Sequence, residues 1–424
     1  MFEISILLYI IGIIILSFSI KNTRVSILFI WPYLIYGTGL AFSAYNYQNE
    51  IFTFTNIYDY YNIYIAQGIM LSFLIIVYLL DNIFFKKNYL AKKFSDIKRI
   101  NVPIVVKIVN STMYQWYMFF QGVILLCLIV LAWTSGEIRI GEYDYTAFAS
   151  LKYWGAIGFF VENIVIGCSL YLYTIFFWKD KVKRNKYLEV FILSVLLFRL
   201  IFGTRLFLAK LIIFMFLIYL INEKKYFRIL KWAILLMIFL SLMALFRLGT
   251  FNTDDISSII LGSVFLEAYF NDLTLLIATQ SFRIEDFYYQ PMGVISFFSS
   301  LLPNFIFDRE DFQTMFLDSN LIMSKLGVDT LSPVGAMSFF AQSIYVFGEY
   351  YIVVFSIVLV IIMLFIKNIK SSYGVFFLLA CGEIIINLWR DSYGIFIKIF
   401  FVHLLLNMIV MYFISKFKYK KDEM

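Results

Sequence analysis

Charged residues are scarce in this sequence, and so are the residues that build metal centres and disulfide frameworks. Only 15% of the 424 residues are charged, and there are three cysteines, five prolines and one histidine. Cys127, Cys168 and Cys381 are too far apart to indicate a disulfide framework or a metal site, so we interpret them as small helix-packing residues. No Walker loop or GxGxxG pattern occurs, which argues against a nucleotide-binding fold. The sequence implies no metal and no cofactor.

Hydrophobic residues dominate instead. They make up 62% of the chain, with 49 Phe, 31 Tyr and 7 Trp, and the mean hydropathy is +0.85. These values lie outside the usual range of soluble globular proteins. The apolar runs are continuous and about 20 residues long, which predicts membrane-spanning α-helices rather than the alternating strands of a barrel. We therefore expect an all-α, polytopic integral membrane protein, with residues 1–424 forming a single membrane domain.

The apolar runs place about eleven transmembrane helices along the chain. They cover residues 4–20, 25–45, 62–85, 113–133, 153–178, 187–202, 206–221, 229–246, 339–366, 373–389 and 393–413. The first run has no basic stretch before it and no small-residue cleavage site after it, so we expect it to be retained rather than removed as a signal peptide. Residues 256–279 form a further buried or re-entrant candidate, interrupted by Glu267 and Asp272. The expected count is thus 10–12.

The basic residues gather on one side of this arrangement. Six short segments hold 24 of the 35 lysines and arginines. These segments are residues 21–24, 86–107, 179–186, 224–231, 367–370 and 416–421. Positive charge collects on the cytoplasmic side of membrane proteins, so we expect the N-terminus outside and the C-terminus in the cytoplasm. The net charge of +7 is then explained by topology, and no nucleic-acid partner is expected.

The opposite, outer side is acidic and carries one long connection. Residues 247–338 form an external loop of about ninety residues between the eighth and ninth expected helices, far longer than ordinary connections. Loops of this length are usually functional. The acidic run 308–311 in this loop (Asp-Arg-Glu-Asp) has the oxygen ligands that a divalent cation prefers, but a solvated charged surface explains it better, so no metal site is assigned.

Isolated basic side chains at the outer ends of helices are the most informative residues. Arg199 and Arg205 flank a glycine-containing turn between two expected helices, and Lys210 lies about one helical turn further in. Arg247 and Arg390 end two other helices. The positive-inside rule disfavours cations there, and arginine binds phosphoryl oxygens in pairs, which predicts a phosphate ligand at the membrane surface. The alternative is that each side chain reaches lipid head groups or pairs with a nearby carboxylate.

Several short motifs follow one another in the C-terminal half. They are Gly-Thr-Arg at 203–205, Leu-Pro-Asn at 302–304, Ser-Pro-Val-Gly at 332–335, Ala-Gln-Ser-Ile-Tyr-Val-Phe-Gly at 341–348 and Arg-Asp-Ser at 390–392. Their order, spacing and expected outer placement resemble the Wzy-type polymerases of O-antigen and capsular oligosaccharide repeat units, from about Arg199 onward. Relatives often have Glu where this chain has Gln342, so no carboxylate role is transferred to that position.

This resemblance implies a glycosyltransferase on the outer face of the bacterial cytoplasmic (inner) membrane. Such an enzyme joins oligosaccharide repeat units by moving a growing chain from one undecaprenyl diphosphate carrier to the next lipid-linked unit. Donor and acceptor would both be undecaprenyl-diphosphate-linked oligosaccharides, with a chain-length regulator and a flippase as expected partners. Positioned cations would stabilise the leaving diphosphate. We assign Arg205, Arg247 and Arg390 to this role first, and Arg199 and Lys210 second.

A general base must also take the proton of the acceptor hydroxyl. Asp391, Glu349 and Glu267 are the carboxylate candidates, since desolvation could tune any of them, although each could equally be an ion-pair partner. His403, the single histidine, is the fourth candidate. It falls near the middle of the last expected helix, where hydrogen bonding between helices is the main alternative.

Other function classes remain open. A flippase or transporter of lipid-linked oligosaccharide should show two related halves and charged residues near the midplane of the membrane. No internal repeat is evident, and the long outer loop suits an outer-face enzyme better. A ligase-like transferase, which moves finished O-antigen to another acceptor, or a membrane O-acyltransferase would have a similar composition. The acyltransferase is disfavoured because it usually needs a catalytic histidine near the surface.

Overall fold

The computed structural model describes residues 2–49, 58–99, 103–136, 154–201, 206–223, 268–269, 271–279, 338–390 and 393–422. Within these residues the regular elements are helices, and no strand occurs among them. Seven of the described helices are long and apolar enough to cross a membrane. This confirms the expectation of a helical, multi-pass membrane protein. The predicted helix 229–246 and nearly all of the predicted external loop lie outside the described residues.

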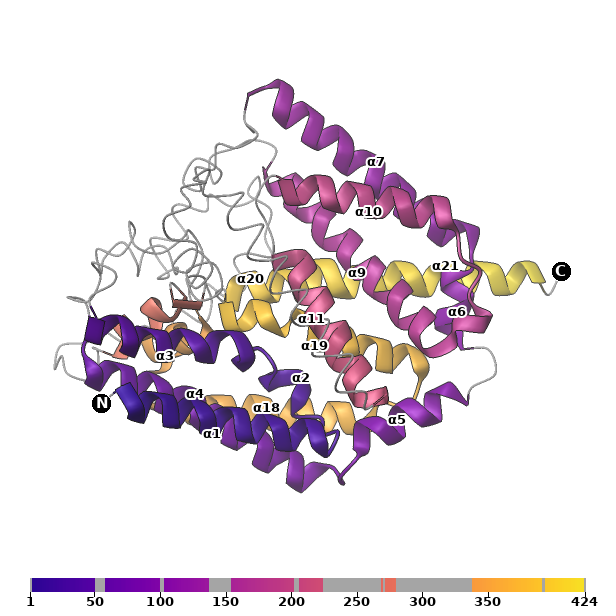
Figure 1. Cartoon of the computed structure of the whole chain (residues 1–424). Helices are drawn as coiled ribbons and strands as arrows, with labels where there is room; N and C mark the ends of the chain where they lie inside the picture. The colour runs from indigo at the N-terminus through magenta and orange to yellow at the C-terminus, as the bar shows by residue number, and fades with distance from the viewer. Residues whose placement is uncertain are drawn as a thin grey trace.

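The described helices follow most of the predicted ranges closely, as Figure 1 shows. They are α1 (Phe2–Lys21), α3 (Tyr33–Asn49), α4 (Tyr60–Phe84), α7 (Thr112–Thr134), α9 (Trp154–Trp178), α10 (Lys186–Ile201), α11 (Leu206–Glu223) and α19 (Ser372–Arg390). The last predicted helix is also continuous, and consists of α20 (Tyr393–Lys398), a π-helix (Ile399–Leu405) and α21 (Leu406–Asp422). The exact number of membrane crossings stays a prediction.

Two of the predicted helices are each divided in two. Residues 25–45 contain the short α2 (Ile27–Ile30) and then α3, with a break at Pro32. Proline has no N–H to donate and its ring collides with the preceding turn, so a continuous helix cannot pass through this position undisturbed. Residues 339–366 contain α17 (Phe339–Phe347) and α18 (Tyr351–Asn368), separated by a short 3₁₀ turn at Gly348. Gly348 has φ of +54°, a conformation that favours glycine.

The basic segment 86–107, predicted as a cytoplasmic connection, contains two short helices, α5 (Tyr89–Lys98) and α6 (Ile104–Val109). In α5 the apolar Leu90, Phe94 and Ile97 are buried, whereas Lys92 and Lys98 are exposed. This division into an apolar and a basic face is typical of a helix that lies along a membrane surface.

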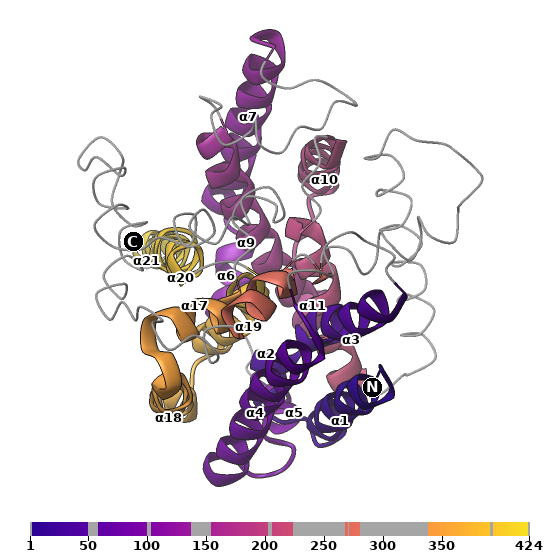
Figure 2. The same ribbon diagram turned by 90° about the vertical axis from the view of Figure 1, so that its left-hand side faces the viewer.

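Helices α9, α11 and α19 form the interior of the bundle, while α1, α7 and α18 lie at its periphery (Figure 2). The peripheral helices expose large apolar side chains such as Leu7, Trp116 and Ile361, as expected of surfaces that face lipid. Two buried tryptophans fix α19 against the α2 region: the indole N–H of Trp31 donates to the Gly382 carbonyl at 2.7 Å, and that of Trp389 donates to the Phe29 carbonyl at 3.0 Å.

Helix α1 begins at one end of the bundle and α21 ends at the other (Figure 1). This arrangement agrees with termini on opposite sides of a membrane. The assignment of the N-terminus to the outside and the C-terminus to the cytoplasm stays a prediction from the distribution of basic residues.

Candidate functional site

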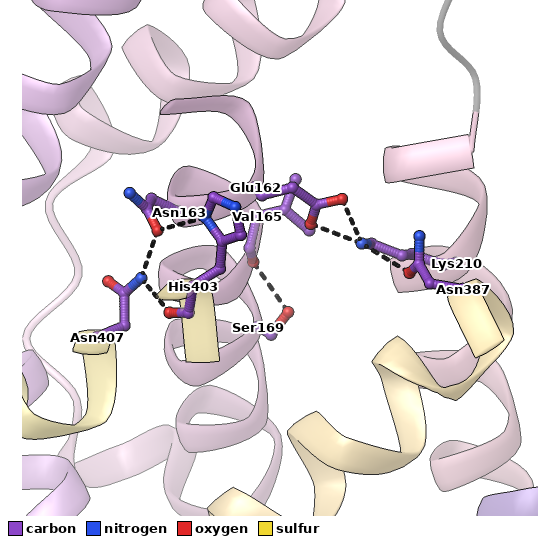
Figure 3. Close-up of polar contacts among 8 residues, drawn as sticks. All are labelled: Glu162, Asn163, Val165, Ser169, Lys210, Asn387, His403 and Asn407. Atoms are coloured by element: carbon purple, nitrogen blue, oxygen red, sulfur yellow. Dashed lines mark hydrogen bonds and ion pairs between the residues drawn. The ribbon is translucent and has the colours of Figure 1, made fainter. Parts of the chain in front are cut away.

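A buried polar site surrounds two adjacent residues of α9, Glu162 and Asn163 (Figure 3). Adjacent residues on a helix point in directions about 100° apart, so Glu162 and Asn163 contact different neighbouring helices. Glu162 turns toward α11 and α19, and Asn163 turns toward the helix formed by the π-helix and α21. Both side chains are about 95% buried. Buried polar groups must find partners within the protein, because lipid offers none.

Lys210 of α11 is held between two other helices. Its ammonium lies 2.7 and 2.9 Å from the two carboxylate oxygens of Glu162 on α9, and 3.4 Å from the amide oxygen of Asn387 on α19. The Lys210 side chain is fully buried, and Glu162 and Asn387 are nearly so. A buried ion pair of this kind specifies how helices pack, since separating the partners leaves a charge without compensation.

Glu383 lies one turn before Asn387 on α19 and is a second buried carboxyl group beside the pair. The hydroxyl of Tyr173 on α9 donates to one Glu383 oxygen at 3.0 Å. The other oxygen, Oε1, has no hydrogen-bond donor. Ser169 of α9 is close by, but its hydroxyl donates to the Val165 carbonyl at 2.9 Å (Figure 3).

His403 occupies the other side of the site, inside the π-helix. Its Nδ1 lies 3.0 Å from the amide oxygen of Asn163, which also accepts a hydrogen bond of 2.8 Å from the side chain of Asn407. The Asn407 amide donates in addition to the His403 backbone carbonyl at 2.6 Å, and Tyr117 of α7 donates to the Asn407 side-chain oxygen. These contacts match the predicted alternative in which His403 bonds neighbouring helices; a catalytic role for it stays a prediction.

The end of α19 gathers segments that are distant in sequence. Asn271 donates to the Trp389 carbonyl at 3.1 Å, and the side-chain oxygen of Gln342 on α17 accepts from the Tyr393 backbone N–H at 2.7 Å. Ser343 and the Tyr393 hydroxyl are 2.5 Å apart. Residues 271–279 are helical and fully enclosed by the protein, so this part of the 256–279 candidate is a buried segment.

The structure describes only some of the predicted site residues. Lys210 and His403 are buried in the two clusters above, and Arg390 is half-buried in the last turn of α19. Arg199 lies in the last turn of α10 and Glu349 in the turn between α17 and α18; only their backbones are described. Four predicted residues lie outside the described part of the chain: Arg205, Arg247, Glu267 and Asp391. The acidic run 308–311 lies outside it as well.

Sequence reasoning did not single out Glu162, Asn163, Glu383 or Asn387. The available signal was an isolated polar or ionisable side chain within a long apolar run, which marks a functional candidate in a membrane protein. Among the described residues, no three His, Cys, Asp or Glu side chains gather in a way that could hold a metal ion. The chemistry of the site is therefore that of one ammonium group, two carboxyl groups, one imidazole and several amides and hydroxyls.

Comparison with known proteins gives no further guide: no family model, no curated protein and no solved structure matches this chain.

Proposed function

We propose that this protein is a membrane glycosyltransferase that polymerises oligosaccharide repeat units carried on undecaprenyl diphosphate, at the outer face of the bacterial cytoplasmic membrane. The reaction breaks the bond between the donor sugar and its lipid diphosphate and forms a glycosidic bond to a hydroxyl of the acceptor unit. The acceptor proton passes to a base, and the lipid diphosphate leaves with the negative charge. The enzyme needs cations at the diphosphate and one base near the acceptor.

One contact carries this proposal. The motifs at 341–348 and 390–392, on which the resemblance to the polymerases rests, belong to segments that meet at the end of α19. Gln342 accepts a hydrogen bond from the Tyr393 backbone, directly after the second motif, and Ser343 bonds the Tyr393 hydroxyl. Gln342 and Ser343 of the first motif thus contact the residue that directly follows the second motif, about fifty residues later in the sequence. This contact supports the proposal that both motifs contribute to one site. An amide at 342 supports this contact as well as a carboxylate would.

Arg390 is the last residue of α19, three residues before Tyr393, and is the described cation that we assign first to the diphosphate. Arg205 and Arg247 share the role in the proposal, with Arg199 as a further candidate. The ammonium of Lys210 is bound to Glu162, so Lys210 contributes to the diphosphate only if it leaves that partner. The base is drawn from Asp391, Glu349, Glu267 and His403.

A strain that lacks the gene, compared with a complemented strain, tests the proposal. Gel analysis of the surface glycan should show loss of the polymer ladder while single repeat units still reach the surface. Purified protein in lipid nanodiscs should then convert lipid-diphosphate-linked repeat units into a ladder of longer products. Loss of the attachment of finished polymer, with the polymer itself retained on its lipid carrier, would instead indicate a ligase-like transferase.

A second function, a flippase for lipid-linked oligosaccharide, is favoured by a different observation. The buried Lys210–Glu162 pair lies inside the bundle, where transporters place charged groups that bind substrate or coupling ions. The same deletion strain separates the two functions. Loss of both polymer and surface repeat units, with lipid-linked units accumulating inside the cell, would support the flippase and contradict the polymerase.

A further inference from the structure

We infer that Glu383, Glu162 and Lys210 together form a site that binds one exchangeable proton inside the helix bundle, and that the proton resides on Glu383 in this structure. The inference does not depend on the proposed polymerase activity. It rests on the burial of three ionisable groups from three helices, on their hydrogen bonds, and on the balance of their charges.

The burial of Glu383 is the first step. Its side chain is about 1% exposed, and its Oε1 atom has no hydrogen-bond donor. Its other oxygen receives one bond, from the neutral Tyr173 hydroxyl. An ionised carboxylate in an apolar interior requires several donors or a cation to replace the water it has lost. The Ser169 hydroxyl is close to Glu383 but gives its proton to the Val165 carbonyl. Glu383 therefore has one donor, Tyr173, and no direct ion pair, which is the environment of a neutral carboxylic acid.

The charges of the neighbours are the second step. Lys210 places its ammonium within 2.9 Å of both oxygens of Glu162, so its charge is already matched by that carboxylate. A second ionised carboxyl at Glu383 would give two negative groups beside this one ammonium. A proton on Glu383 makes the three side chains neutral as a set, and so removes the cost of an uncompensated buried charge.

Lys210 can reach either carboxyl group. Its ammonium already contacts Asn387, 3.4 Å away, and Asn387 and Glu383 are four residues apart on one face of α19. Side chains at this spacing lie about 6 Å apart on a helix surface. A rotation of the flexible lysine side chain therefore moves it from Glu162 to Glu383, and the proton then moves from Glu383 to Glu162. The site has two arrangements of equal total charge, and each ties α11 to a different neighbour.

The other titratable groups around Glu383 are compatible with this scheme. Among the described residues, those that face it come from α9 and α11, and they are Tyr173, Cys168, Glu162 and Lys210. Helices α2 and α17 also pack on α19 and carry no charged residue. Packed against α19 as well are α6, which carries Lys107, α20, which carries Lys398, and the π-helix, whose His403 bonds Asn163 rather than Glu383.

Infrared difference spectroscopy on the purified full-length protein in nanodiscs tests the inference directly. A protonated carboxylic acid gives a C=O stretching band above the amide I band, and this band shifts in heavy water. Wild type minus Glu383→Gln should show such a band at neutral pH, because the variant removes the acid and leaves other buried carboxyl groups unchanged. Glu383→Asp, which keeps the acid, should move the band rather than remove it, and it serves if the glutamine variant does not fold.

Glu162→Gln gives the sharper result. It leaves Glu383 in place but frees Lys210 to neutralise it, so the protonated-acid band should be lost although Glu383 is still present. The matched control is Glu189→Gln, because Glu189 forms an exposed two-bond pair with Arg184 and no acid band should change. Absence of the band from wild type, or its persistence in Glu162→Gln, would overturn the shared proton site. Neither outcome depends on whether the protein makes polymer.

Discussion

The ammonium of Lys210 is paired with the carboxylate of Glu162. Among the described residues, Glu383 is the buried acid close enough to take the place of Glu162. We therefore expect Glu162→Gln and Glu383→Gln each to lower the free energy of unfolding only modestly, since one carboxylate remains for the ammonium. The double variant leaves a buried lysine without a counter-charge and should cost about 3 kcal/mol or more. Thermal or denaturant unfolding in detergent measures this. Additive effects of the two substitutions would contradict the shared role of the carboxyl groups.

Asn163 is the residue on which His403 and Asn407 converge. Replacing it with alanine removes the acceptor of two hydrogen bonds between buried helices, so Asn163→Ala should lower stability by about 1 kcal/mol. Asn82→Ala is the matched control, because Asn82 is exposed and its amide bonds only the carbonyl of Tyr78 in its own helix. Equal midpoints for the two variants in a thermal unfolding series would show that the His403 cluster does not hold the helices together.

Among the described residues, Arg390 offers the most direct test of the proposed polymerase activity. If its guanidinium stabilises the leaving diphosphate, Arg390→Ala should lower polymerisation about 100-fold at normal protein levels. Arg184→Ala supplies the control, because that arginine forms an exposed pair with Glu189 and has no assigned part in the reaction. Product ladders from nanodisc-embedded enzyme provide the measurement. A normal ladder from Arg390→Ala would remove Arg390 from the diphosphate site.

At the scale of the elements, the buried residues 268–269 and 271–279 pack directly on the backbone of α3. A Cβ added at Gly39 would lie 2.2 Å from an oxygen of Asp272 and 2.6 Å from the backbone of Ala268. Gly39→Ala should therefore displace the segment and cost about 2 kcal/mol, as overpacking of a core does. Gly158→Ala is the control, because a Cβ there meets nothing within 4 Å and alanine favours the helix. Unfolding midpoints compare them, and a tolerated Gly39→Ala would contradict this packing.

The elements also show what the sequence could and could not predict. Apolar runs located most helices to within a few residues, because a membrane-spanning helix is defined mainly by length and composition. Breaks at Pro32 and Gly348 were missed, since hydropathy averaged over a run does not register a single backbone constraint. The Lys210–Glu162 contact was missed for another reason. It joins residues 48 positions apart, and their contact depends on how α9 and α11 pack rather than on either helix alone.

For the whole molecule, the direction of the helices agrees with termini on opposite sides of a membrane, and the distribution of charge predicts which of them is cytoplasmic. The basic segments hold 24 of the 35 lysines and arginines, and α1 begins at the end of the bundle opposite to that at which α21 ends. We therefore expect a reporter fused after Lys421 to be cytoplasmic and a tag before Phe2 to be accessible from outside the membrane. Removing basic residues from the cytoplasmic connections tests whether positive charge causes this orientation.

Neutralising the basic residues of the first connection, Lys21 and Arg24, should weaken the orientation less than neutralising the seven of residues 86–107, because orientation follows the local sum of positive charge. The guanidinium of Arg24 also lies 3.9 Å from the carboxylate of the buried Asp81. Replacing Arg24 therefore lowers stability as well, whereas replacing the exposed Lys21 does not. Accessibility of the two tags to a membrane-impermeant reagent measures the result for each variant. Both tags on the same side in the unmodified protein would require an even number of crossings, and so would exclude the eleven-helix arrangement.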